Sequence, residues 1–225
     1  MKTINSIGSW LLTITLPFIL IMFAIRILFT PLFLTFEYNF PGFPADNYGF
    51  NKEERLHWGK ESMRYLFNRS HESSLSNLRF SDGSTIYNER EISHMVDVKV
   101  LLLKSIDVFN VVIIFYALFI FTAFKGNEEY KFWKGIYRGS WLTVGLIAGI
   151  LIGIAVSFNQ LFTLFHKLFF TGDTWLFNLS DTLIRLFPMR LWQDAFIFMG
   201  IITLGLAVLL ISIGRKRRFP ETSIQ

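Results

Sequence analysis

The chain contains no cysteine, and only 17% of its 225 residues carry a charge. Without cysteine there can be no disulfide bond, no thiolate nucleophile and no zinc site built on sulfur. The charged fraction lies well below the roughly 25% that is usual for soluble domains. Too few charged side chains are therefore present to cover a water-facing surface, which excludes an ordinary soluble domain.

Apolar residues dominate the rest of the composition, because 52% of the chain is hydrophobic and 26 residues are phenylalanine. This balance predicts an integral membrane protein. The net charge of +5 does not indicate nucleic-acid binding, because most of the excess lies beside apolar runs. The N-terminus has one lysine and no small-residue cleavage site, so we interpret it as a retained first span and not as a removed signal peptide.

Four apolar stretches are long enough to cross a bilayer, which takes about 20 helical residues. We therefore predict an all-α membrane protein with four transmembrane helices and a mainly helical extracytoplasmic segment between the first two. Glycines in the third span, such as Gly145 and Gly149, predict close helix packing. The predicted order is N-terminus and first span 1–35, extracytoplasmic segment 36–106, second span 107–124, basic connector 125–138, third span 139–162, aromatic interfacial segment 163–192, fourth span 193–214 and basic tail 215–225.

The charge of the connecting segments predicts the orientation in the membrane. The connector 125–138 has four Lys or Arg against two Glu, and the tail 215–225 begins with four basic residues. Short basic segments stay in the cytoplasm, so both termini are expected there and the segment 36–106 outside. The segment 36–106 and the interfacial segment 163–192 are then expected at the outer leaflet of the membrane.

The extracytoplasmic segment contains two helix starts and one ambiguous loop. Asn51 and Glu54 have the spacing of a capping box, which predicts a short amphipathic helix. Serine, asparagine and an Asp-Gly pair then favour a loop or a small β hairpin over 69–84. Asn88 caps a further helix, with Glu91 at its third position, and this helix continues into the second span.

The stretch from Asn88 to Lys99 concentrates titratable groups at the mouth of a bilayer helix. Glu91, His94 and Asp97 lie within it, and His94 follows Glu91 by three residues, so both share one helix face. Each residue also has a purely structural explanation. Glu91 can be a capping-box glutamate, Asp97 can pair with Lys99, and His94 can be a satisfied buried imidazole.

A second histidine, His166, lies in an apolar stretch at the outer interface. An imidazole titrates near physiological pH and is costly to bury without a partner. The predicted topology places His94 and His166 on the same outer face, so we expect the two side chains to converge. His57 and His71 lie in polar sequence and are interpreted as solvent-facing.

Two further residues are candidates for lipid contact. Arg26 lies near the end of the first span, where it either snorkels to the headgroups or contacts an anionic or ester-bearing lipid group. Trp175 lies in the aromatic segment after the third span, and tryptophan is enriched at membrane interfaces.

Two parts of the chain carry a family resemblance. They are the run Glu91-Ile92-Ser93-His94-Met95-Val96-Asp97-Val98-Lys99, and a later region with Leu164-Phe165-His166, Asp173-Thr174-Trp175, Thr182-Leu183-Ile184-Arg185-Leu186-Phe187-Pro188 and Trp192. With the four-span layout and the long outer segment, these residues resemble the lipoprotein intramolecular transacylases of low-GC Gram-positive bacteria. The resemblance covers nearly the whole chain, although the loop 69–84 offers nothing to match.

The resemblance implies a substrate and a reaction. Members of this family are expected to move the sn-2 acyl chain of a diacylglyceryl-modified lipoprotein to the free α-amine of its N-terminal cysteine, which gives a lyso-form lipoprotein. The expected partners are this lipoprotein and membrane lipid. No cofactor, metal or nucleic acid is expected.

The chemistry of the candidate residues is compatible with that reaction. Aminolysis of an ester needs a base for the attacking amine, an acid for the departing oxygen and donors for the oxyanion. Tethering of amine and ester in one molecule removes the need for a nucleophilic side chain. The predicted roles are His94 and His166 as base and acid in either order, Glu91 or Asp97 as the orienting carboxylate, and Lys99 or Arg185 as the oxyanion-stabilising cation.

Two other functions remain open from the residues alone. The first is a metal-dependent membrane hydrolase, with His94, His166, Glu91 and an aspartate as ligands. The second is a membrane scaffold or accessory subunit, in which the stretch 88–99 is an interface. A transporter is disfavoured, because the spans after the first contain almost no ionisable residue.

Overall fold

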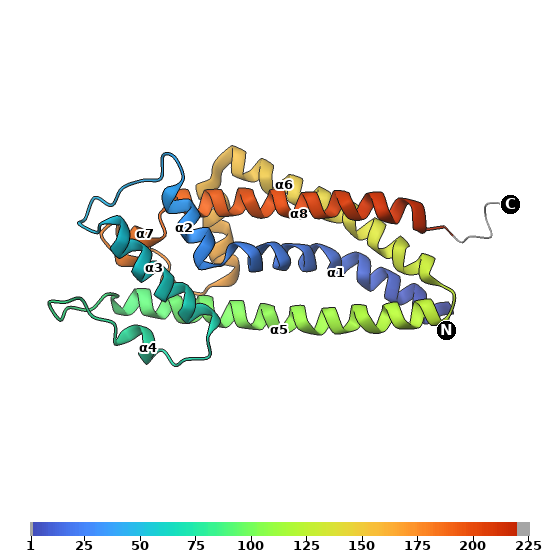
Figure 1. Cartoon of the computed structure of the whole chain (residues 1–225), viewed down its shortest axis with the longest axis horizontal. Coiled ribbons are helices and arrows are strands. Elements are labelled where there is room, and N and C mark those ends of the chain that lie inside the picture. Colours follow the sequence, from blue (N-terminus) through green and yellow to red (C-terminus); the bar gives the residue numbers. More distant parts are fainter. Residues whose placement is uncertain (1, 220–225) are drawn as a thin grey trace. The chain divides into compact units, whose positions relative to one another are not determined.

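The structure is a computed structural model, and it describes residues 2–219 of the chain. No strand occurs within these residues, so the predicted all-α fold is confirmed. In place of a hairpin, the loop 69–84 holds one helical turn and a single bridge between Arg79 and Thr85. The helices are α1 (Lys2–Leu28), α2 (Pro31–Asn39), α3 (Lys52–Phe67), α4 (Ser73–Ser76), α5 (Glu89–Lys125), α6 (Glu129–Phe169), α7 (Thr182–Leu186) and α8 (Met189–Arg217) (Figure 1).

Four of these helices are long and apolar enough to cross a membrane, which confirms the predicted number of spans. They are α1, α5, α6 and α8. α5 has 37 residues and α6 has 41, whereas about 20 cross the hydrocarbon layer. Both helices therefore extend beyond any single span, and the segment boundaries given above stay predictions. The end of the basic tail, 220–225, lies outside the described residues.

Contacts within the chain divide it into two units. The first unit contains Met1–Arg26, Ile106–Val156 and Ile197–Gln225. The second unit contains Ile27–Ser105 and Ser157–Phe196. The first unit thus holds most of the apolar helix length, and the second holds both predicted site histidines.

The first unit is built on close contacts between apolar faces of α1, α5, α6 and α8. A Cβ at Gly135 of α6 would lie 2.7 Å from the Ser9 carbonyl oxygen, and one at Gly139 would lie 2.9 Å from a side chain of α1. Close packing thus occurs at Gly139, the first residue of the predicted third span, and at Gly135 of the predicted connector. The close approach that Gly145 and Gly149 allow does not occur at these two positions, because a Cβ there would meet no described atom within 4 Å.

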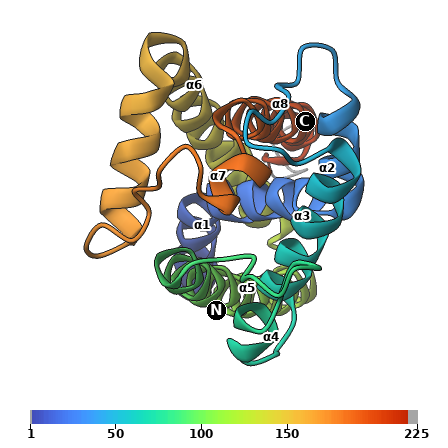
Figure 2. The same cartoon turned by 90° about the vertical axis from the view of Figure 1, so that its left-hand side faces the viewer.

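The second unit packs α2, α3 and α7 together, and α3 contacts both of the others (Figure 2). The predicted capping box at the start of α3 is confirmed: the Asn51 side chain accepts a hydrogen bond from the Glu54 amide at 2.9 Å, and Glu54 accepts one from the Asn51 amide at 2.9 Å. The core beneath these helices contains Leu34, Tyr38, Met63, Leu66, Leu75, Ile86, Leu183, Leu186 and Leu191.

α6 is interrupted at Ser157, whose φ of −164° and ψ of 99° are extended rather than helical. The Ser157 hydroxyl accepts a hydrogen bond from the amide of Gln160, three residues further on, at 3.4 Å. This is the geometry of an N-cap. The residues after Ser157 therefore form a separately capped helical segment, and this segment carries His166.

Glu37 of α2 is fully buried, and neither of its carboxylate oxygens accepts a hydrogen bond from the described residues. Burial raises the pKa of Glu37 from 4.5 to about 7, and the nearby Asp194 raises it further, whereas Arg190 acts in the opposite direction. Asp194 itself pairs with Arg190 at 2.5 Å. Burial thus favours the protonated form of Glu37, so its carboxyl keeps a proton to a higher pH than an exposed glutamate does.

This raised pKa predicts how stability depends on pH. The folded chain holds the Glu37 proton to a higher pH than the unfolded chain, so stability falls as pH rises from about 4.5 to about 7. Glu37→Gln cannot ionise, so its thermal midpoint should lose this part of the pH dependence and exceed that of the parent protein by several degrees at pH 8. The exposed Glu53→Gln is the control. Parallel pH curves for Glu37→Gln and the parent protein would contradict the assignment.

Candidate active site

The start of α5 is fixed by a capping box that also reaches α7. The Asn88 side chain accepts a hydrogen bond from the Glu91 amide at 3.0 Å, and Glu91 Oε2 accepts one from the Asn88 amide at 2.8 Å. Glu91 Oε1 accepts a third from the amide of Leu183 at 2.6 Å. The capping interpretation of Glu91 is thereby confirmed. Both carboxylate oxygens are engaged with backbone amides, so Glu91 makes no contact that would orient an imidazole.

His94 lies on the next turn of α5 and is only 8% exposed. Its ring is edge-on to Phe170 and Phe177, with centroid separations of 5.1 Å and 5.4 Å. Its Nδ1 is buried and has no hydrogen-bond partner among the described residues. His94 therefore does not fit the structural explanation of a satisfied core histidine.

His166 lies in the capped segment of α6 and is 7% exposed. Its Nδ1 lies 2.8 Å from the backbone carbonyl oxygen of Phe162, one turn earlier. Because a carbonyl oxygen can only accept, this contact places the proton on Nδ1. In neutral His166 the Nε2 atom then carries the free lone pair, and this nitrogen can accept a proton.

The two imidazole rings, which the sequence predicts to meet, lie face to face. Their centroids are 5.7 Å apart and their planes differ by 25°. Aromatic rings surround His166 closely, with Phe162 at 4.2 Å and Trp175 at 4.9 Å. In such an apolar setting a charged imidazole is costly, and two charges side by side cost more. The pair is therefore suited to carrying one proton at a time.

One buried hydrogen-bond donor packs against the pair, because the Trp175 ring lies 4.9 Å from His166 and its indole Nε1 makes no hydrogen bond within residues 2–219. The hydroxyl of the preceding Thr174 is also buried and makes none there. Buried polar groups in native proteins are almost always paired. Trp175 Nε1 and His94 Nδ1 therefore lack partners that a polar ligand can supply. Sequence reasoning identified Trp175 only as a lipid contact and missed Thr174, whose sole signal was its place in the Asp173-Thr174-Trp175 stretch.

The predicted cation Lys99 is engaged elsewhere in the second unit. Its Nζ donates to the Ser70 carbonyl at 2.7 Å and to Asn68 Oδ1 at 3.2 Å, and lies 3.9 Å from the centre of the Tyr65 ring. The alternative of an ion pair between Asp97 and Lys99 was therefore wrong. Asp97 is half-buried and forms no hydrogen bond or ion pair with the described residues, so no contact supports an orienting role for it.

Arg185 is likewise held by another partner. It donates through Nε and Nη2 to the two carboxylate oxygens of Asp46, at 3.1 Å and 3.0 Å, and stacks 3.8 Å above Phe50. Burial alone would raise the pKa of Asp46, but hydrogen bonds from Arg185 and from the amides of Phe50 and Tyr48 lower it below its usual range. Asp46 is thus ionised at neutral pH, and its ion pair with Arg185 holds the 46–50 loop against α7. No contact among the described residues places Arg185 beside the histidine pair, so none supports a role for it at an oxyanion.

The remaining predicted residues have different environments. His57 and His71 are exposed, as interpreted from the sequence. Arg26 is exposed in the last turn of α1, and its contact with lipid stays a prediction. Trp175 packs on His166, so at least one face of its ring is directed at the site and not at lipid.

The described residues contain no group of three or more His, Cys, Asp or Glu side chains arranged to hold a metal ion. The histidine pair therefore lacks the third donor that the metal-hydrolase alternative requires. Glu91, the carboxylate that this alternative assigned as a ligand, has both oxygens on backbone amides.

Fold and site together define a class: a four-span helical membrane protein with two stacked, buried imidazoles among aromatic side chains. Comparison with known proteins gives the family. The chain belongs to the family described as lipoprotein intramolecular transacylase Lit, whose model matches residues 10–192. An uncharacterized protein of Aquifex aeolicus (strain VF5) is 31% identical over 209 residues, which is 92% of each chain.

Solved structures show the same fold. The membrane integral lipoprotein intramolecular transacylase Lit from Bacillus cereus superposes with a TM-score of 0.80 at 22% sequence identity, covering 96% of each chain. A variant of that protein with a histidine-to-arginine substitution superposes with a TM-score of 0.74 at 23% identity, covering 100% of this chain and 96% of the other.

Proposed function

We propose that this protein is an acyltransferase that moves the sn-2 acyl chain of a diacylglyceryl-modified lipoprotein to the free α-amine of its N-terminal cysteine. The product is a lyso-form lipoprotein that is N-acylated. Membership of the transacylase family supports the reaction class. The observation that carries the proposal for this chain is the stacked, buried pair of His94 and His166 beside unpaired hydrogen-bond donors.

The reaction is a transfer within one molecule and needs no external reactant. The amine nitrogen attacks the ester carbonyl carbon, so a C–N bond forms and a tetrahedral oxyanion develops. Collapse of this intermediate breaks the bond to the glyceryl sn-2 oxygen, which takes up the proton that the amine loses. Atoms and charge therefore balance, with an ester and an amine converted into an amide and an alcohol.

His166 acts as the base in this scheme. Its Nδ1 proton is held by the Phe162 carbonyl at 2.8 Å, which leaves Nε2 to accept the proton of the attacking amine. Once protonated, the imidazolium gives that proton to the departing glyceryl oxygen. His94 stays neutral beside the new charge, because two adjacent imidazolium ions are unfavourable. Its N–H then hydrogen-bonds the leaving oxygen.

The oxyanion is stabilised by Trp175 and Thr174 in preference to Lys99 or Arg185. Within residues 2–219 the Trp175 Nε1–H and the Thr174 hydroxyl are buried donors without a hydrogen-bond partner. Lys99 and Arg185, in contrast, bind Ser70 and Asp46. Neutral donors fixed in an apolar site are effective at a developing negative charge, because they need no reorganisation.

Proximity supplies much of the remaining rate. Amine and ester belong to the same lipoprotein, and a well-oriented intramolecular reaction gains up to ~7–11 kcal/mol over a bimolecular one. A covalent acyl-enzyme is then unnecessary. An acyl-histidine intermediate is the less favoured variant of the scheme, and mass spectrometry of trapped protein distinguishes it.

The proposed location follows from the basic segments 125–138 and 215–225. Both are expected in the cytoplasm of a bacterial cell, so that the histidine pair faces the outer leaflet, where lipoprotein esters lie. The proposed partners are accordingly a diacylglyceryl-modified lipoprotein and membrane lipid.

Substitution of either paired histidine should abolish conversion. We expect His94→Ala and His166→Ala to lower turnover by a factor of about 100 or more, the usual range for loss of a general acid or base. The exposed histidines give matched controls, and His57→Ala and His71→Ala should keep full activity. The assay expresses each variant in a host whose lipoproteins have free N-termini and identifies the N-terminal lipopeptides by mass spectrometry.

Near-normal conversion by both paired-histidine variants would refute the proposal. If His166→Ala does not accumulate in the membrane, His166→Gln keeps most of the side-chain volume and decides the question. A scaffold without enzymatic activity predicts a different result, in which no lyso-form product appears even with the parent protein.

Trp175→Phe separates the proposed donor from its packing. The phenyl ring can still cover His166, but the Nε1–H is lost, so turnover should fall by roughly 10-fold to 1000-fold while the apparent KM and the thermal midpoint change little. Trp192→Phe is the control, because Trp192 packs near Phe162 without being an unpaired buried donor in the described chain. Equal turnover of Trp175→Phe and the parent protein would exclude the indole as an oxyanion donor.

A further inference from the structure

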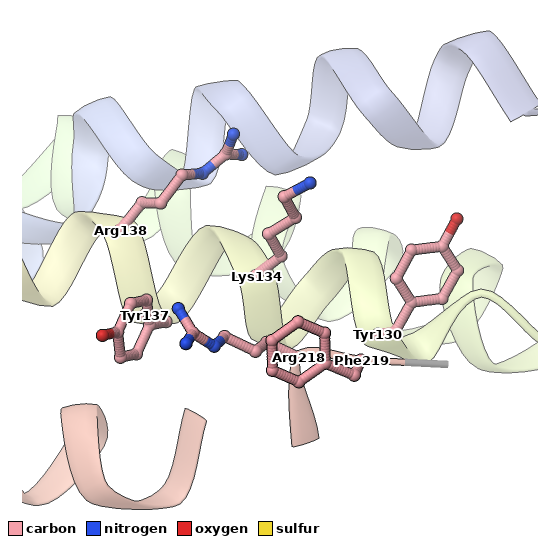
Figure 3. Close-up of a pocket in the computed structure, with 6 residues that line it drawn as sticks. All are labelled: Tyr130, Lys134, Tyr137, Arg138, Arg218 and Phe219. Atoms are coloured by element: carbon pink, nitrogen blue, oxygen red, sulfur yellow. The ribbon is translucent and has the colours of Figure 1, made fainter. Parts of the chain in front are cut away.

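A second candidate site lies in the first unit, where α6 begins and α8 ends. A pocket of about 260 Å³ is lined by the aromatic side chains of Tyr130, Tyr137 and Phe219 and by three cations (Figure 3). The cations are Lys134, Arg138 and Arg218. No residue of the histidine site takes part, since all the lining residues belong to the first unit.

Among the described residues the three cations have no carboxylate partner. None of them forms an ion pair with any residue of 2–219. The nearby acid Glu128 is already used, because it accepts hydrogen bonds from Asn5 at 2.6 Å and from Lys131 at 2.8 Å. Three cationic side chains thus line one small pocket, and Figure 3 shows Lys134 and Arg138 directed toward α1 and Arg218 lying beside Tyr137. An anion in the pocket would be attracted by all three.

Aromatic stacking fixes the two guanidinium groups. Arg138 lies 3.9 Å from the centre of the Trp10 ring and donates to the Ser9 hydroxyl at 2.9 Å. Arg218 lies 4.0 Å from the centre of the Tyr137 ring, beside which Figure 3 shows its guanidinium. The Nε atoms of both arginines are buried and have no hydrogen-bond partner in the described chain. Stacking leaves guanidinium N–H edges open for planar recognition of an oxyanion.

The close approach of α8 to α6 explains how Arg218 reaches this pocket. A Cβ at Gly214 would lie only 3.2 Å from the Tyr137 Cβ, so the two helices nearly touch one turn before Arg218. The end of α8 is thereby held over α6. Helix packing therefore positions the lining residues of α6, and it brings the end of α8, which Arg218 and Phe219 follow directly, next to them.

We propose that this pocket binds the phosphodiester group of an anionic phospholipid. Cationic side chains between transmembrane helices are a recognised arrangement for acidic lipid headgroups. Tyr130, Tyr137 and Phe219 suit the headgroup level, where amphipathic and aromatic rings gather. The pocket adjoins two helices that cross the membrane, so a lipid phosphate is present at high local concentration, unlike free phosphate. The site is independent of the proposed transacylase reaction.

Binding of defined lipids to the purified full chain tests this site. Native mass spectrometry in detergent should show that phosphatidylglycerol binds more tightly than phosphatidylcholine, which has the same phosphodiester but no net charge. Lys134→Gln combined with Arg218→Gln should weaken phosphatidylglycerol binding by roughly tenfold or more. Arg215→Gln combined with Lys216→Gln removes the same charge from exposed residues outside the pocket and should weaken it less than threefold, within the range of surface charge effects.

Three results would overturn the site. They are equal affinity for the two lipids, equal loss in both double variants, and stabilisation by inorganic phosphate that matches phosphatidylglycerol at the same concentration. If the pocket double variant does not fold, binding of phosphatidylglycerol to the single variant Lys134→Gln, whose side chain is exposed, tests the site. Weaker phosphatidylglycerol binding by it supports the site, and unchanged binding rejects it. The measured quantity is lipid binding and not lyso-lipoprotein formation, so a failure of this site is distinguishable from a failure of the proposed function.

Discussion

The free-energy cost of burying a charged imidazole away from water determines how the two histidines of the second unit bind protons. Each histidine of the pair is nearly inaccessible, and rings of phenylalanine and tryptophan surround them. Such surroundings favour the neutral form and give each bound proton a large effect on its neighbour. The capped α6 segment supplies the Phe162 carbonyl that fixes the His166 tautomer, and the Glu91 capping box holds the α5 turn that carries His94. Two local caps thus place two side chains that are remote in sequence.

Much of the fold could be predicted from the sequence, because the signals were local. Four apolar runs predicted the four spanning helices, and the spacing of Asn51 and Glu54 predicted the start of α3. Convergence of the two histidines followed from topology, not from contacts. The break at Ser157 was not predicted, because neither a proline nor a composition change marks it. The loop 69–84 contains an Asp-Gly pair that suits a hairpin turn, but the flanking strands do not form.

The partners of the charged residues were the least predictable part. Lys99 and Arg185 lie in the same two stretches of sequence as the histidines, and these stretches carry the family resemblance. The directions of the two side chains are nevertheless set by tertiary contacts with Ser70 and Asp46. Glu37 gave no sequence signal at all, although it is the most completely buried acid of its unit. Thr174 and Trp175 became candidate oxyanion donors only through the structure, because their side-chain donors lack hydrogen-bond partners among the described residues. Spacing along a chain shows which residues share a helix face and does not show what lies opposite.

The most direct measurement of the central claim is nitrogen NMR of the protein labelled with ¹⁵N-histidine, with each resonance assigned by substitution. At pH 7 His166 should be neutral with its proton on Nδ1, and His94→Phe should shift the His166 ring resonances, because the two rings are stacked at 5.7 Å. A His166 proton on Nε2 alone, or His166 resonances that do not move on His94→Phe, would contradict the proposed roles of the pair.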